Sequence, residues 1–415
     1  MHARLTGLWR HPDFLKLWLG QTISLFGSQI TEWALPLAAD LILKATPAQM
    51  GVLVAARTTP FFLVSLFAGV WVDRLRRRPV LIVADLGRAV LLGFIPLAAL
   101  AGWLRLEQLF IIAFLTGILT VFFDTAYQAF LPSLVERDQL VEGNSKLAFT
   151  LSAAELAGPG LAGGLAQWLT APIAIALDAV SFVISAFCLI GIRKLEPQPS
   201  PIGHPNIWRE ILEGLQVIAS DPRLRAIAAS ALALNFFGGV YDALIVVYVT
   251  RELGLAPLFV GLRFFAGSFS GLFIALWSDR LARHLGLGPS IILGAFLIGL
   301  ASIFVPLTGG PPLVALLLMG ISGLIGGAGN MTYNISLTSV AQSIVPERLL
   351  GRYNASLSFI ALGLLPLGSL IGGALGQRFG LRMAMVVFAI GSVSAFLWVF
   401  LSPLRNLRKI PASAS

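Results

Sequence analysis

The chain has 415 residues, of which 57% are hydrophobic and only 12% are charged, with a formal net charge of +9. A soluble domain carries about twice this share of charged residues. The composition therefore excludes a soluble enzyme and favours a protein whose solvent is the lipid bilayer.

The remaining composition argues against several kinds of site. The single cysteine, Cys188, lies in an apolar run, which leaves no disulfide framework and no cysteine metal site. The four histidines are scattered through polar segments. The basic residues form no patch interleaved with aromatic residues, so nucleic-acid binding is not expected. We expect no metal and no cofactor, and no P-loop for ATP is present.

Twelve apolar runs are long enough to be membrane helices. In chain order they lie near 15–40, 48–72, 79–101, 107–131, 146–168, 171–192, 224–250, 256–278, 286–306, 311–338, 354–377 and 381–402. The fold predicted is an all-α membrane protein with two six-helix bundles, at 1–192 and 223–402. A linker at 193–222 joins them, and a tail follows at 403–415.

The basic residues predict the orientation of these spans. Of the 29 Lys and Arg residues, 21 fall on the side that holds both termini, five fall on the opposite side and three lie inside spans. The positive-inside rule then places both termini in the cytoplasm.

The linker begins with four prolines and continues as an amphipathic segment. Its apolar face carries Trp208, Ile211, Leu212, Leu215 and Ile218. This face is expected either to lie on the membrane surface or to pack under a bundle. The simplest function for the segment is to tether the two halves.

A repeated motif indicates that the two halves are related. Trp71, Asp73, Arg74 and Leu75 recur as Trp277, Asp279, Arg280 and Leu281. An offset of 210 also superposes Ser133 on Ser343, Asn144 on Asn354 and Pro47 on Pro257. Two parallel six-helix repeats are one of the known transporter architectures.

The repeat and its motif resemble those of the major facilitator superfamily. Gly69, Asp73, Arg74, Arg77 and Arg78 are similar to its signature G-x-x-x-D-R-x-G-R-R, with Arg76 in place of the second Gly. The segment AGPGLAGG resembles the Gly-Pro motif of the family's antiporters, through Gly158, Pro159, Gly163 and Gly164. The arginine motif of the family's fourth helix is absent. The branch it looks most like contains macrolide-efflux proteins and enterobactin exporters.

The Asp-Arg motif has two interpretations. The resemblance favours a gating motif made of Gly69, Asp73, Arg74, Arg77, Arg78, Asp279 and Arg280, in which charges pair in one conformation and separate in another. The alternative is a permanent cap on the helix ends that fixes topology.

Acids inside spans are costly and usually have a function. The proton-coupling candidates are Glu32, Asp242, Asp124 and Glu155. Glu32 has an alternative as a structural partner of Arg57, and Asp124 has one as a partner of Arg88. Asp85 and Arg88, three residues apart, are expected to pair with each other.

The helix-five glycines and the cavity candidates also have two interpretations. Gly158, Pro159, Gly163 and Gly164 form either a hinge that seals the cavity or a static close contact. In this superfamily, helices one, four, seven and ten line the cavity. Polar and aromatic residues on those spans are the substrate-cavity candidates: Gln21, Trp33, Tyr127, Asn235, Phe236, Tyr333 and Asn334.

Together these features predict a monomeric, proton-coupled exporter in a bacterial inner membrane, and not an enzyme. Its expected partners are the lipid bilayer, protons and a hydrophobic or amphipathic small molecule, such as a drug or a siderophore-like metabolite. A lipid or lysolipid flippase and a non-transporting membrane receptor or scaffold are the alternatives. Export in particular rests on the resemblance of helix five.

Overall fold

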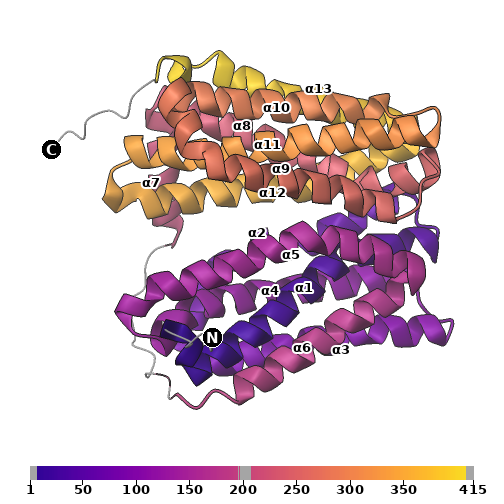
Figure 1. Ribbon diagram of the computed structural model, residues 1–415, viewed down its shortest axis with the longest axis vertical. Helices are drawn as coiled ribbons and strands as arrows, with labels where there is room; N and C mark the ends of the chain where they lie inside the picture. The colour runs from indigo at the N-terminus through magenta and orange to yellow at the C-terminus, as the bar shows by residue number, and fades with distance from the viewer. Residues whose placement is uncertain (1–6, 195, 197–206, 408–415) are drawn as a thin grey trace, which may run out of the picture. The chain divides into compact units, whose positions relative to one another are not determined.

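A computed structural model describes residues 7–194, 196 and 207–407, apart from some side chains within helices (Figure 1). The described chain is helical throughout, as predicted. It divides into two compact units. The first comprises 1–45 and 56–204, and the second comprises 46–55 and 205–415. The change of unit at 204/205 falls within the segment predicted as a linker.

Six long helices build the first unit, except that the start of the second of them, up to residue 55, belongs to the second unit. They are α1 (Pro12–Leu41), α2 (Pro47–Arg74), α3 (Arg77–Leu100), α4 (Leu106–Leu134), α5 (Leu140–Trp168) and α6 (Ala171–Ile190). Short 3₁₀ turns, η1 (Gly7–Arg10) and η2 (Arg137–Gln139), precede α1 and α5. Helix α1 packs on α5 and α6, while α3 packs on α4 and α6.

The second unit contains the equivalent six helices and one more. They are α7 (Ile207–Ser220), α8 (Pro222–Val247), α9 (Leu258–Leu285), α10 (Leu287–Leu307), α11 (Pro312–Ile344), α12 (Glu347–Phe379) and α13 (Leu381–Phe400). A π-helical turn, η3 (Tyr248–Glu252), extends α8, and a 3₁₀ turn, η4 (Pro403–Asn406), follows α13. Each of the twelve runs predicted from the sequence coincides with one of these long helices.

The two units repeat one packing scheme. Helix α8 packs on α12 and α13, and α10 packs on α11 and α13, as α1 and α3 do with their counterparts in the first unit. A detail of this scheme recurs at an offset of 206. Gly117 of α4 lies against the backbone carbonyl of Arg57, and Gly323 of α11 lies against that of Arg263. The internal repeat inferred from the sequence is therefore present in the packing.

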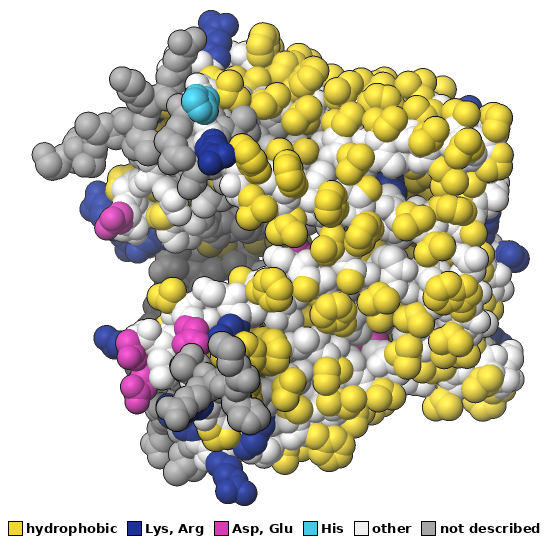
Figure 2. All heavy atoms as spheres, in the orientation of Figure 1, with side chains coloured by type: hydrophobic (Ala, Val, Ile, Leu, Met, Phe, Trp, Pro, Cys, Tyr) yellow, Lys and Arg dark blue, Asp and Glu magenta, His cyan; other side chains and the backbone are white. Residues whose placement is uncertain are grey.

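Within the described residues, nine helices are long and apolar enough to cross a membrane: α3, α4, α6, α8 with η3, α9, α10, α11, α12 and α13. Helices α1, α2 and α5 are not among the nine, although their lengths of 30, 28 and 29 residues lie within the range of those nine helices. Twelve spans remain a prediction. On the visible face of each unit, hydrophobic side chains cover the middle of the helices, and most of the Lys and Arg side chains lie near helix ends (Figure 2).

The amphipathic linker helix α7 packs on α12 of its own unit. Ile211 and Ile218 are buried, and Leu215 packs against the same apolar cluster. Ser356 of α12 donates a hydrogen bond of 3.0 Å to the Ile211 carbonyl, and Arg352 forms an ion pair with Glu213. Of the two positions expected for this face, packing under a bundle is the one observed. The Trp208 side chain lies outside the described residues.

The start of α8 is fixed by a side-chain cap. Asp221 accepts a hydrogen bond of 2.7 Å from the backbone N–H of Arg223, as N-cap residues do. Hydrogen bonds from the Arg223 guanidinium lower the pKa of the Asp221 carboxyl. This cap marks the boundary between α7 and the first long helix of the second unit.

Close glycine contacts predict which substitutions disturb the second unit. A Cβ at Gly327 of α11 would collide with the backbone of Gly267 on α9, whereas a Cβ at Gly320 of the same helix would meet open space. We expect Gly327→Val to destabilise the protein by about 1–3 kcal/mol, as overpacking does. Thermal unfolding in detergent measures the change. Gly320→Val is the matched control, and an equal loss in both variants would contradict the packing argument.

Candidate functional site

An ion pair joins α1 and α2 within the apolar helices of the first unit. The Arg57 guanidinium of α2 lies 2.7 Å from the Glu32 carboxylate of α1. The side chains are 30% and 37% exposed, so neither is fully buried within the bundle. The structural pairing considered from the sequence is thus present, and Glu32 is a coupling candidate that already has a cation beside it.

The other three acids predicted for coupling lie in different surroundings. Asp124 of α4 is exposed, and it lies within electrostatic range of Arg88 on α3. Glu155 of α5 lies within electrostatic range of Glu32. Asp242 of α8 is half-buried beside Tyr241 in the second unit. The structure therefore brings Glu32 and Glu155 near each other and places Asp124 in a separate group.

That separate group is a buried polar cluster in the first unit. Its core is the predicted pair, in which Arg88 donates a hydrogen bond of 2.5 Å to Asp85. Both side chains are almost fully buried, and the Arg88 guanidinium lies between the rings of Phe123 and Phe182, at 4.3 and 4.1 Å from their centroids. This planar stacking is one that guanidinium ions favour.

The cluster contains a residue that the sequence interpretation missed. Asp178 of α6 is 1% exposed and lies within electrostatic range of both Arg88 and Asp85. Its Oδ1 accepts a hydrogen bond of 3.0 Å from Ser181. A signal is present in the sequence, since Asp178 is the only Asp, Glu, Lys or Arg residue between Ala171 and Gly191. The rule for acids inside spans applies to it as well as to Asp124.

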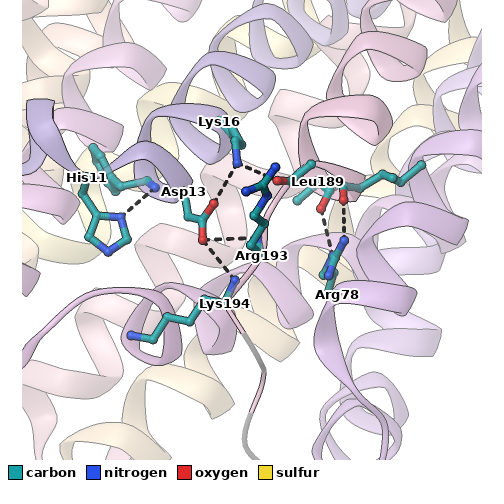
Figure 3. Close-up of polar contacts among 10 residues, drawn as sticks. His11, Asp13, Lys16, Arg78, Leu189, Arg193 and Lys194 are labelled. Carbon is teal, nitrogen blue, oxygen red and sulfur yellow. Dashed lines mark hydrogen bonds and ion pairs between the residues drawn. The ribbon is translucent and has the colours of Figure 1, made fainter.

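At one end of the first unit, a second polar cluster ties α1 to the segment after α6 (Figure 3). Asp13 accepts hydrogen bonds from the backbone N–H groups of Arg193 at 3.2 Å and Lys194 at 3.0 Å, and from the Lys16 ammonium at 2.9 Å. Lys16 also donates to the Gly191 carbonyl at 2.6 Å. The start of the linker is thereby fixed on its own bundle.

Two arginines of the predicted gating motif belong to the same end. The Arg78 side chain donates to the carbonyls of Leu189 and Ile190 at 2.9 and 2.5 Å, and so caps the end of α6. At the start of α3, Glu196 accepts hydrogen bonds from the backbone N–H groups of Arg77 and Arg78 at 2.7 and 3.2 Å. A carboxylate at a helix N-terminus is favourable for both charge and hydrogen bonding.

The rest of the gating motif is less fully described. A Cβ at Gly69 would meet open space, Arg74 is exposed, and Arg280 stacks over the Trp277 ring at 4.5 Å. The side chains of Asp73 and Asp279 lie outside the described residues. Gating by these residues stays a prediction, whereas the helix-capping alternative describes what Arg78 does here.

The helix-five motif forms a close contact between α5 and α1. Gly158, Pro159, Gly163 and Gly164 are all buried, and a Cβ at Gly158 would collide with the Gln29 side chain. Helix α5 continues without interruption through Pro159. The close packing expected from these glycines is present, and the hinge remains a prediction.

The predicted cavity residues lie in three kinds of environment. Gln21 and Tyr333 are buried within their own bundles, and the Tyr333 hydroxyl donates to Ser230 at 3.1 Å. Trp33, Tyr127, Asn235 and Phe236 are half-buried, while Asn334 is exposed and bonded to Asn330. Burial in a bundle core favours a packing role for Tyr333. The described residues contain no group of three or more His, Cys, Asp or Glu side chains that could hold a metal ion.

Comparison with known proteins places this chain among transporters. Residues 17–366 match the family model described as the Major Facilitator Superfamily. The multidrug efflux pump Tap of Mycolicibacterium fortuitum is 27% identical over 82% of this chain and 85% of its own length. The enterobactin exporter EntS of Citrobacter koseri is 26% identical over 97% of this chain and 94% of its own length.

Solved structures agree on the fold. The nucleoside transporter NupG superposes with a TM-score of 0.78 at 12% identity and covers 94% of this chain and 98% of its own. A bacterial homologue of the iron transporter ferroportin gives a TM-score of 0.73 at 21% identity, with coverage of 94% and 98%. At these identities the likeness concerns the fold alone.

The Glu196 cap gives a prediction for the stability of the first unit. We expect Glu196→Gln to destabilise the protein by about 0.5–2 kcal/mol, because two backbone N–H groups of α3 lose their charged acceptor. Chemical or thermal unfolding of the purified protein measures this. Glu136→Gln is the control, since Glu136 is exposed and makes no side-chain cap bond. A control that loses as much stability as Glu196→Gln would refute the assignment.

Proposed function

Because the chain belongs to the Major Facilitator Superfamily, we propose that it is a secondary active exporter of hydrophobic or amphipathic small molecules, driven by the proton gradient. The observation that carries the proposal is the similarity to an efflux pump and an enterobactin exporter along 82% and 97% of the chain. The proposed cargo is a drug or a siderophore-like metabolite.

Acids that lie inside the apolar helices support proton coupling. Glu32 lies beside Arg57, with Glu155 within electrostatic range, and Asp242 is half-buried in the equivalent helix of the other half. A proton on Glu32 would weaken its attraction to Arg57, because a neutral carboxyl keeps a hydrogen bond but loses the charge–charge interaction. Such an interaction, made in one protonation state and lost in the other, can bias a conformational equilibrium.

The proposed cycle is alternating access, in which the 1–192 bundle moves against the 223–402 bundle. In this proposal both termini lie in the cytoplasm of a bacterium, which the excess of Lys and Arg on their side supports. Within the motif, Arg78 and the N–H groups of Arg77 and Arg78 are committed to static caps in the first unit. We therefore assign the gating charges, which pair in one conformation and separate in the other, to Asp73 and Arg74. Asp279 and Arg280 form the second copy, which is flanked by fewer arginines.

Transport in reconstituted vesicles tests this function. In proteoliposomes with an imposed pH gradient, we expect accumulation of a fluorescent lipophilic cation or of enterobactin, with proton movement in the opposite direction. Glu32→Gln and Asp242→Asn each remove a titratable group at nearly constant size, and we expect each to lower gradient-driven accumulation about tenfold or more. Glu107→Gln, the same change at an exposed end of α4, is the control and should match the parent.

The other outcomes separate the alternatives. Translocation of a labelled lysolipid without proton movement would support a flippase in place of an exporter. Accumulation that is unchanged in both the Glu32→Gln and the Asp242→Asn variant would remove these acids from coupling. If none of the probes moves in any variant, the transport proposal fails and a receptor or scaffold becomes the better explanation.

A further inference from the structure

The buried polar cluster of the first unit contains more acid than it can neutralise. Asp85, Asp124 and Asp178 all lie within electrostatic range of a single cation, Arg88, and the one ion pair among them in the described chain joins Arg88 to Asp85. Asp178 is 1% exposed and has no Lys or Arg within ion-pair distance among the described residues. An ionised carboxylate in such a place costs many kcal/mol, and buried acids bind a proton instead.

Other polar atoms aimed at this cluster lack partners. The Arg88 Nε and Asp85 Oδ2 atoms are buried and make no hydrogen bond within the described chain. Thr31 of α1, which is 9% exposed, lies within hydrogen-bonding reach of Asp178, although its hydroxyl forms no hydrogen bond of standard geometry within the described chain. Such groups are rarely left unsatisfied in a site built for stability alone.

The absence of a side chain at Gly27 of α1 leaves space for the Asp178 carboxyl. A Cβ at Gly27, one turn before Thr31, would collide with Asp178 Oδ1 and Ser181 Oγ. Among the described residues, the groups that act on the Asp178 carboxyl are Thr31 from α1, Asp85 and Arg88 from α3, and Ser181 from α6. Helix α5, which also packs on α6, contributes none among the described residues.

The second half of the chain shows that the fold does not need these charges. At the offset of 210, Asp85 corresponds to Ala295, Arg88 to Ile298, Asp178 to Phe388, Thr31 to Tyr241 and Gly27 to Phe237. There the same helix crossing holds aromatic rings, with Tyr241 and Phe388 at a centroid distance of 4.9 Å. The Arg263 guanidinium of α9 lies 4.8 Å from the Tyr241 ring centroid, and no acid takes the place of Asp85 or Asp178. Ala295 is fully buried, and Phe388 is 9% exposed. Replacing buried ionic groups with apolar ones is often stabilising, so the charged version is retained for another reason.

We propose that the cluster of Thr31, Asp85, Arg88, Asp124 and Asp178 is a proton-binding site in which Asp178 carries the proton. On release, the O–H bond of the Asp178 carboxyl breaks, both electrons stay on the oxygen, and the proton passes to a water molecule, which becomes hydronium. Arg88 then shares its charge between Asp85 and the new Asp178 carboxylate. The occupancy of the site stands by itself, while its use in transport rests on the proton coupling proposed above.

Infrared spectroscopy of the full-length protein in lipid vesicles tests the occupancy. Near neutral pH we expect a carbonyl band of a protonated carboxyl group that Asp178→Asn removes. Asp138→Asn, the same change at an exposed turn, is the control and should keep the band. Thermal unfolding of each variant confirms that it is folded. A band that persists unchanged in folded Asp178→Asn would overturn the proposal.

A transport measurement tests the role of the site in the cycle. Asp178→Asn mimics the protonated state, so we expect it to retain substrate exchange at equal pH and to lose gradient-driven accumulation about tenfold or more. Accumulation equal to that of the parent would refute the coupling role. If the parent itself shows no gradient-driven transport, the proposed function fails, and the infrared result alone decides whether the site binds a proton.

Discussion

The structure depends on how closely its helices approach one another. Between helices in a bilayer the hydrophobic effect gives little attraction, because lipid tails are as apolar as the side chains. Van der Waals contact must supply what water would otherwise drive, and it requires small residues at the crossings. The contacts of Gly158 with Gln29 and of Gly327 with Gly267 are of this kind. Every polar group inside the bundles is positioned by these crossings.

The same scaffold then carries different chemistry in its two halves. Gly27 lets α1 approach α6 with a carboxyl between them, whereas Phe237 meets Gly391 at the equivalent crossing. Asp178 and Arg88 of the first unit correspond to Phe388 and Ile298 of the second. The repeat therefore fixes the positions of the helices, and individual substitutions decide which positions hold charge.

The helices and the repeat were predictable from the sequence because both follow from local patterns. Apolar run length gave the twelve helices, and the recurrence of Trp-x-Asp-Arg-Leu gave the duplication. Helix α12 begins at Glu347, well before the predicted 354, because its first turns carry charged side chains that an apolar run does not include. Hydropathy reports the length of the apolar run that fits the bilayer. A helix that continues beyond the bilayer is longer than this run.

The candidate site was only partly predictable because partners are set by tertiary contact. The Asp85–Arg88 pair follows from a spacing of three residues on one helix. The Glu196 bonds to the start of α3 join residues 118 and 119 positions apart, which no spacing rule reaches. Asp178 is absent from the candidates predicted from the sequence, although a lone acid in an apolar run is itself a signal.

The difference between Asp178 and Phe388 also bears on how the chain diverged after duplication. Two identical halves would carry either two acid clusters or none. A tandem copy of the second half alone could preserve every helix crossing and would have aromatic rings where the first half has Asp178 and Thr31. The helix crossings are therefore common to the two halves, whereas the buried acids Asp85 and Asp178 have Ala295 and Phe388 as their counterparts.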